Sequence, residues 1–316
     1  MMKKQNVCLI IVFTIFLSFY ISPNVSKAGE FDLFQDELTD GKTISVIDPE
    51  TKIVVKKFTP DIYQLITNIE SYRNEIENWV HEFANGTNNH IGYNKPMLLD
   101  RIDEKGRVIK GRPLITVNEK ELVDKIIDLS FTGGLVEIPI IFTESDYSEN
   151  DVPHFNEVVL ATYTTYFKSY HSGRSKNIEL SAMAINNVIL GNGDIFSFNS
   201  VVGPRDVASG YQMAPEIIKG KMVMGIGGGI CQTSSTLFNA VDQLELKILE
   251  RHHHSKEVGY VPKGRDATVS FGGLDFQFQN TTGVPFIIKS YYQQGAITIQ
   301  IKTSKEYEHI LKHEFS

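Results

Sequence analysis

Apolar positions in the first half of the chain recur with periods that predict alternating strands and helices. Ile44–Ile47 and residues 53–58 flank the turn sequence Asp48-Pro49-Glu50-Thr51, a pattern typical of a β-hairpin. A second hairpin is expected within residues 97–109, around Glu104-Lys105-Gly106. Between the hairpins a helix is predicted, with an apolar face made of Ile62, Leu65, Ile66, Ile69, Ile76, Trp79, Val80 and Phe83.

A short helix and a strand complete the first half. Asn118 is expected to cap a helix that carries Leu122 and Ile126 and stops at Gly133-Gly134. Residues 135–142 are predicted to form one strand. We therefore expect an α/β module over residues 44–145, followed by a polar, acidic boundary over residues 145–153.

The second half begins with a β-rich run over residues 158–167 and an amphipathic helix over residues 175–190. Further on, Leu237, Ala240, Val241 and Leu244 predict a helix that starts at or near Cys231, and residues 267–301 are β-rich. The expected fold class is α+β with two domains. The C-terminal domain, residues 155–303, should be a curved antiparallel sheet packed with the helix that starts at the cysteine, and residues 304–316 should be a tail.

The N-terminus has the pattern of an export signal. Lys3 and Lys4 precede an apolar run over residues 7–21, and a Ser-x-Ala cleavage sequence ends at Ala28. We expect residues 1–28 to be a signal peptide and residues 29–43 a linker. An uncleaved membrane anchor through residues 7–21 is the alternative, because the run is near the lower length limit for a membrane span. Either way the protein should be exported, to the extracellular face of the membrane or the cell wall.

Charge and cysteine content narrow the functional classes. The chain has 316 residues and a net charge of −7, without a basic run, so nucleic-acid binding is not expected. Loss of residues 1–28 would remove Cys8 and leave Cys231 as the single cysteine, without an internal disulfide. A lone thiol in an oxidising compartment is a liability unless it is buried or used.

Cys231 follows the glycine-rich sequence Gly225-Ile226-Gly227-Gly228-Gly229. At a helix start the macrodipole and unpaired N–H groups favour the thiolate. Glycines allow a close approach of the backbone to substrate and can direct N–H groups toward an oxyanion. The alternative is an inert, buried cysteine that follows a flexible loop.

Histidines downstream could serve as the base that a thiol nucleophile needs. If residues 246–254 form a strand, His252 and His254 share a face and His253 points away. We expect His254 to be the base, His252 the second choice, and Asp266 the group that orients the imidazole. A solvated strand end is one alternative, and a zinc site of His252 and His254 with Asp266 or Cys231 is another. We expect no metal or cofactor, because no second ligand cluster such as HExxH or CxxC is present.

Ordered motifs extend over roughly residues 155–290. They are Phe196-Ser197-Phe198-Asn199, Gly203-Pro204-Arg205, Gly210-Tyr211, Gly227-Gly228-Gly229-Ile230-Cys231-Gln232, Glu250-Arg251-His252, His254-Ser255, and Tyr260-Val261-Pro262 followed by Gly264 and Asp266-Ala267-Thr268-Val269. Together these motifs strongly resemble the VanW family. Residues 42–145 more weakly resemble the peptidoglycan-binding module that precedes VanW domains in YoaR-like exported proteins of Gram-positive bacteria.

This resemblance implies a function. Some VanW-domain proteins are understood to be cysteine-dependent peptidoglycan L,D-transpeptidases, so the nucleophile would be Cys231, and His252 and His254 match family positions. The expected partners are peptidoglycan stem peptides and glycan. Alternatives are a cysteine endopeptidase or carboxypeptidase of peptidoglycan, and a non-catalytic wall-binding or glycopeptide-resistance accessory protein. With the resemblance in view, we expect oxyanion or substrate-binding roles for Gly228, Gly229, Gln232, Ser234, Arg205 and Tyr211. Of these, Arg205 would bind a stem carboxylate.

Overall fold

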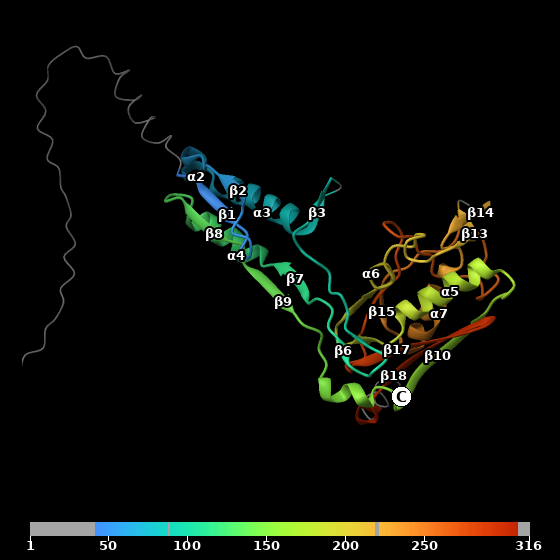
Figure 1. Cartoon of the computed structure of the whole chain (residues 1–316). Helices are drawn as coiled ribbons and strands as arrows, with labels where there is room; N and C mark the ends of the chain where they lie inside the picture. Colours follow the sequence, from blue (N-terminus) through green and yellow to red (C-terminus); the bar gives the residue numbers. More distant parts are fainter. Residues whose placement is uncertain (1–41, 88, 219–220, 309–316) are drawn as a thin grey trace, which may run out of the picture.

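Two separate hydrophobic cores organise the chain, which the computed structural model describes over residues 42–87, 89–218 and 221–308 (Figure 1). The expected leader, most of the linker and the end of the tail lie outside these residues. Helices and several antiparallel sheets confirm the predicted α+β class. Within the described residues, no helix combines the length and the hydropathy needed to cross a membrane.

The N-terminal core is built on a three-stranded sheet in the order β2-β1-β8. Strand β1 (Ile44–Ile47) is antiparallel to β2 (Val54–Phe58) and parallel to β8 (Gly134–Glu137). The predicted first hairpin is confirmed. Its turn is held by the Asp48 carboxylate, which accepts the N–H groups of Glu50 at 3.0 Å and Thr51 at 2.7 Å.

Three helices pack into this core: α2 (Ile62–Thr67), α3 (Ile69–Asn85) and α4 (Glu119–Asp128). The single helix expected from residue 62 to 83 is wrong, because Asn68 interrupts it and caps α3 by accepting the N–H of Ser71 at 3.1 Å. Asn118 caps α4 as predicted. Two short strands, β3 (Gly86–Thr87) and β4 (His90–Ile91), form a hairpin after α3.

The strand predicted over residues 135–142 is also wrong. It is split at Ile138-Pro139 into β8 and β9 (Ile140–Thr143), and β9 pairs with β7 (Leu114–Val117). Proline has no N–H to donate to a ladder, which favours a change of partner at this point. The β7–β9 ribbon leads from the N-terminal core toward the C-terminal one (Figure 1).

The C-terminal core contains a six-stranded sheet in the order β10-β18-β17-β11-β5-β6. The first four strands are antiparallel neighbours: β10 (Val158–Tyr166), β18 (Ala296–Thr303), β17 (Phe286–Gln293) and β11 (Val188–Leu190). The expected second hairpin is present as β5 (Arg101–Ile102) and β6 (Val108–Ile109). Because β5 pairs with β11, backbone hydrogen bonds cross the boundary expected between the two domains.

Helices α5 (Ser172–Ile185) and α7 (Ile230–Val241) pack against this sheet and against each other. The helix predicted over residues 175–190 ends early. Asn187 has a positive φ of 65°, and the last three residues of the predicted helix form β11 instead. The apolar side chains of Val152, from the 3₁₀ helix η1 (Glu149–His154), and Phe155 pack with Ile189 and Ile287 in a smaller cluster.

A smaller sheet in the order β12-β16-β15 lies beside the core, with β12 (Ile195–Ser197), β16 (Gln277–Gln279) and β15 (Lys247–Glu250). Helix α6 (Phe198–Val202), the hairpin of β13 (Met213–Ile218) and β14 (Lys221–Ile226), and 3₁₀ helices η2 (Asp242–Leu244) and η3 (Lys305–Tyr307) complete the described residues. Strand β15 ends at Glu250, so it does not continue to residue 254 and the three histidines lie outside it. Only a single bridge, from His252 to Thr268, follows it.

Candidate active site

Cys231 is the second residue of helix α7, as the sequence predicted. The preceding turn requires glycine, because Gly229 has a φ of 113° and a Cβ on Gly228 would lie 2.6 Å from the carbonyl oxygen of Ala214. The N–H groups of Ile230 and Gln232 donate to backbone carbonyls. In the described part of the chain the N–H of Cys231 has no acceptor, so it is free to bind an oxyanion.

Polar side chains of α7 hold a second segment, residues 265–267, against the helix. The Ser235 hydroxyl accepts the N–H of Ala267 at 2.9 Å, and Asn239 donates to the carbonyl oxygen of Arg265 at 2.8 Å. Both side chains are buried. These bonds fix Asp266 close to the helix start.

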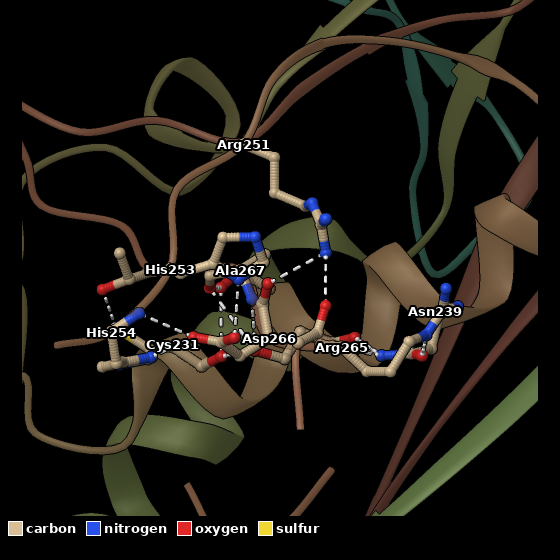
Figure 2. Close-up of polar contacts among 12 residues, drawn as sticks. Cys231, Asn239, Arg251, His253, His254, Arg265, Asp266 and Ala267 are labelled. Atoms are coloured by element: carbon tan, nitrogen blue, oxygen red, sulfur yellow. Dashed lines mark hydrogen bonds and ion pairs between the residues drawn. The ribbon is translucent and has the colours of Figure 1, made fainter. Parts of the chain in front are cut away.

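Asp266 and His254 form a buried pair beside Cys231 (Figure 2). The Oδ2 atom of Asp266 lies 2.7 Å from Nδ1 of His254 and accepts the backbone N–H of His254 at 2.7 Å. The side chain of His254 is 7% exposed and that of Asp266 is 9% exposed. Because Nδ1 is engaged, Nε2 is the ring nitrogen available to the thiol, whose Sγ also lies 3.6 Å from Thr268 Oγ1 and from the Val269 carbonyl oxygen.

The electrostatics favour a thiolate–imidazolium pair. Burial raises the pKa of the Cys231 thiol, but the hydrogen bond and charge of His254 outweigh it, so the pKa lies below its ordinary value. Burial lowers the pKa of His254, whereas Cys231 and then Asp266 raise it above the ordinary value. Burial raises the pKa of Asp266, yet the backbone N–H of His254 and the imidazoles of His253 and His254 bring it down to about 2.

The other two histidines are placed differently from the strand-based expectation. His253 does not point away from His254, because its Nδ1 lies 2.9 Å from Oδ1 of the same Asp266 carboxylate. His252 instead contacts Glu250, with Nε2 and Oε1 2.8 Å apart. The expected alternation is therefore wrong: the three residues follow β15 in an irregular segment, where side chains need not alternate.

A cavity of about 760 Å³ opens onto the thiol. Cys231, Gly229, Gln232 and His254 line it. Six other predicted residues do not: His252, Asp266, Gly228, Ser234, Arg205 and Tyr211. The remaining wall is made of Tyr166, Phe167, Lys168, His171, Arg174, Pro215, Glu216, Glu257, Val258, Gly259, Tyr260, Thr268, Val269, Ser270 and Leu274.

Three of the predicted binding residues use their polar groups inside the protein. The Gln232 amide nitrogen donates to Thr165 Oγ1 and to the carbonyl oxygen of Tyr166, both at 3.0 Å, so it has no proton left for an oxyanion. Ser234 donates to the carbonyl oxygen of Ala267 at 2.5 Å and is fully buried. The Gly228 carbonyl accepts from the buried Asn177 side chain at 3.0 Å. These three residues therefore stabilise the structure around the site through these bonds.

Arg205 packs against the glycine-rich sequence Gly225–Gly229, since a Cβ on Gly227 would be 3.4 Å from the Cβ of Arg205. Its guanidinium lies over the rings of Phe198 and Phe271, at 5.5 and 5.6 Å, and Nη1 donates to Asn199 at 2.7 Å. The Nε and Nη2 atoms are buried without a partner. Burial lowers the pKa of Arg205, and burial raises the pKa of the nearby Tyr211.

Arg174 and Tyr260 are site residues for which the sequence predicts no role, although Tyr260 lies in one of the family motifs. Nη2 of Arg174 donates to the Oε1 atom of Gln232 at 2.7 Å, and its guanidinium lies 5.8 Å from the Tyr260 ring. Burial raises the pKa of the Tyr260 phenol. The only sequence signal for Arg174 is a cation next to a predicted helix start, which does not point to a site formed by distant residues.

The geometry also bears on the zinc alternative. His252 and His254 contact two different carboxylates, those of Glu250 and Asp266, and do not converge. Among the described residues, no group of three or more His, Cys, Asp and Glu side chains could hold a metal ion.

Comparison with known proteins agrees with the motif pattern. A family model described as VanW like protein matches residues 173–302. The protein YoaR of Bacillus subtilis is 40% identical over 205 residues, which cover 64% of this chain and 68% of YoaR. The vancomycin B-type resistance protein VanW of Enterococcus faecalis is 28% identical over 148 residues, 45% of this chain and 54% of that protein. No solved structure matches the chain. The chain belongs to the VanW family and is YoaR-like.

Proposed function

We propose that the protein is a cysteine-dependent acyltransferase of the cell wall, a peptidoglycan L,D-transpeptidase. The observation that carries the proposal is the pair of Cys231 and His254 on the cavity wall, with Asp266 bonded to His254, the thiol pKa lowered and the imidazole pKa raised. A nucleophile, a base and an orienting carboxylate are the set that acyl transfer through a thiol needs. Membership of the VanW family supports the choice of peptidoglycan as substrate.

In the acylation step, the Cys231 thiolate attacks the carbonyl carbon of the third residue of a tetrapeptide stem. A C–S bond forms, and the N–H of Cys231 binds the resulting oxyanion. The protonated His254 gives its Nε2 proton to the nitrogen of the leaving residue, so the C–N bond breaks and D-alanine departs. The product is a thioester on Cys231 and a neutral imidazole that Asp266 keeps oriented.

In the second step, the side-chain amine of a neighbouring stem attacks the thioester carbon. His254 accepts the proton from that amine, a new C–N bond forms, and the C–S bond breaks to return the thiolate. The two stems are then joined by a 3–3 cross-link. If water takes the place of the amine, the same site acts as a carboxypeptidase and releases a shortened tripeptide.

We propose that this chemistry takes place outside the cytoplasmic membrane. Residues 1–28 would direct export, or residues 7–21 would anchor the chain, and the module over residues 44–145 would bind peptidoglycan. The support is the resemblance to YoaR-like exported proteins and the separate core of this module. The Enterococcus faecalis relative is named for vancomycin resistance, which agrees with a role in the wall.

A product assay tests the proposal. The purified protein is incubated with disaccharide tetrapeptides. The products are separated by chromatography, and their masses are measured by mass spectrometry. We expect dimers joined 3–3 and free D-alanine from the wild type, and neither from Cys231→Ala. Tripeptides without dimers would identify a hydrolase. If Cys231→Ala made as much product as the wild type, the proposed chemistry would be excluded, and binding without any product would favour an accessory protein.

A further inference from the structure

Two cations on the cavity wall, Lys168 and Arg174, have no ionic partner among the described residues, and Arg174 is the one that is hydrogen-bonded to the residue after Cys231. Arg174 forms no ion pair there, whereas Arg265, also near α7, is paired with Asp242 at 2.7 Å. Of the two acidic residues on the same wall, Glu257 is paired with Lys263, and Glu216 forms no ion pair with Arg174. A half-buried guanidinium without a carboxylate is available to bind an anion that enters the cavity.

The protein holds this guanidinium in a fixed place next to the nucleophile. The Arg174 side chain crosses the start of α7, since a Cβ on Gly229 would lie 2.9 Å from its Cγ. Its Nη2 donates to Gln232 Oε1, and the Gln232 amide is oriented in turn by Thr165 and the Tyr166 carbonyl. Arg174 is therefore anchored to the residues on both sides of Cys231.

The chemistry of a peptide end fits this arrangement. In a peptide cleaved at its last bond, the terminal carboxylate is one residue, roughly 3.8 Å from Cα to Cα, beyond the carbonyl that the thiolate attacks. A peptide cleaved in its interior has an uncharged amide at that point. The nitrogens of Arg174 that Gln232 does not engage, together with the arginine's permanent charge, match a carboxylate and not an amide.

We propose that Arg174 binds the C-terminal carboxylate of the acyl-donor peptide and so restricts the cavity to peptides cleaved at their last bond. This inference rests on the proposed function and adds a specificity residue to it. It disfavours the endopeptidase alternative, because an interior peptide bond would leave the guanidinium opposite an uncharged amide.

A binding experiment tests the site without catalysis. Full-length Cys231→Ala protein is titrated calorimetrically with tetrapeptides that have lysine or diaminopimelic acid at the third position, each with a free C-terminal carboxylate or a C-terminal amide. For whichever of the two free-acid peptides binds more tightly, we expect an affinity about ten- to a hundred-fold higher than that of the corresponding amide, as for a hydrogen-bonded charge pair. Equal affinities for acid and amide, or no binding of any peptide, would overturn the proposal.

Variants in the same background locate the effect. Arg174→Met should remove the preference for the acid, and Arg174→Lys, which keeps the charge without the planar fork, should keep part of it. Lys176→Met is the matched control, since Lys176 lies on the same helix and pairs with Glu179 outside the cavity. It should keep the full preference. A preference that survives in Arg174→Met, or disappears in Lys176→Met, would contradict the assignment.

The two proposals can fail separately. If the acid is preferred through Arg174 but the wild type forms no thioester and no product, the carboxylate site stands and the proposed acyl transfer does not. If the wild type forms product equally well from acid and amide peptides, acyl transfer stands and the role of Arg174 is wrong.

Discussion

Helices α3 and α7 differ in how many polar side chains they bury. In α3 the buried residues are Tyr72, Ile76, Val80 and Ala84, which share one face, and the other side chains are exposed or half-buried. In α7 every residue from Gln232 to Val241 is buried. Six of these are polar: Gln232, Thr233, Ser234, Ser235, Thr236 and Asn239.

The polar groups of α7 are all hydrogen-bonded, so their burial does not leave unsatisfied atoms. Thr233 pairs with Ser181 and Thr236 with Thr165, each at 2.7 Å, while Ser235 and Asn239 hold residues 265–267. An apolar helix would pack into the same core without the free-energy cost of buried polar groups that lack a partner. The buried face of α3 is therefore mainly apolar packing, whereas the buried polar side chains of α7 hold Cys231 and Asp266 in register.

The largest expected effect comes from His254. His254→Ala should slow product formation about 10⁴-fold, the upper end for an acid–base group, because the thiolate also loses its counter-charge. His252→Ala, which removes the neighbouring histidine bonded to Glu250, is the control and should retain most of the rate. Steady-state assays on both variants show whether His254 or His252 is the general base. A larger loss in His252→Ala would make that residue the base.

Asp266→Asn should lower the rate about 10²-fold, less than the ~10⁴-fold seen for serine triads, because the thiolate itself supports the imidazolium. In the wild type, activity should fall at low pH as the thiolate is protonated and at high pH as His254 loses its proton. Removal of the carboxylate lowers the pKa of His254, so the high-pH limb of the bell-shaped profile should move to lower pH. Asp242→Asn is the control. An unchanged profile would separate Asp266 from catalysis.

Ser235→Ala tests the positioning role of α7. It removes the acceptor for the Ala267 N–H and the donor to the Cys231 carbonyl, bonds of 2.9 and 2.6 Å. Thiol alkylation by iodoacetamide should slow by about ten-fold or less, and its pH midpoint should rise. Ser181→Ala, which deletes another buried hydroxyl bonded to α7, should lower thermal stability and leave the midpoint in place. Equal midpoints in all three proteins would contradict the positioning role.

The smallest effect on the thiol is expected from α3. Ile76→Ala opens a cavity in the N-terminal core and should destabilise it by about 2–5 kcal/mol, as measured by denaturant unfolding. The alkylation rate of Cys231 should stay within two-fold of the wild type, roughly the scatter of neutral substitutions. Asn74→Ala, on the exposed side of α3, should change neither property. Slower alkylation of Cys231 in Ile76→Ala would show that the two cores are coupled.

The sequence predicts the parts of the molecule that follow local rules. The β1–β2 turn at Asp48, the cap at Asn118 and the helix start at Cys231 are each specified by residues within a few positions, and each is found as expected. The errors occur where a single residue redirects a periodic pattern. Asn68 breaks the apolar face of the first helix, and Pro139 moves a continuous strand into a second sheet.

The candidate site shows the same division. Its chemistry is local, since the glycine loop and Cys231 are adjacent in sequence. Its geometry depends on contacts between distant segments, such as the bond from Arg174 to Gln232 and those from α7 to residues 265–267. The pairing of His253 and His254 with one carboxylate could not be read from strand alternation, because β15 ends before them.

Acylation of Cys231 can be detected by intact-protein mass spectrometry. Wild-type and Cys231→Ala proteins are quenched in acid seconds after mixing with tetrapeptide. We expect a mass increase on the wild type equal to the mass of the tetrapeptide minus that of D-alanine, absent from Cys231→Ala and removed by hydroxylamine. An unmodified wild type that nevertheless forms cross-linked product, or the same adduct on Cys231→Ala, would contradict it.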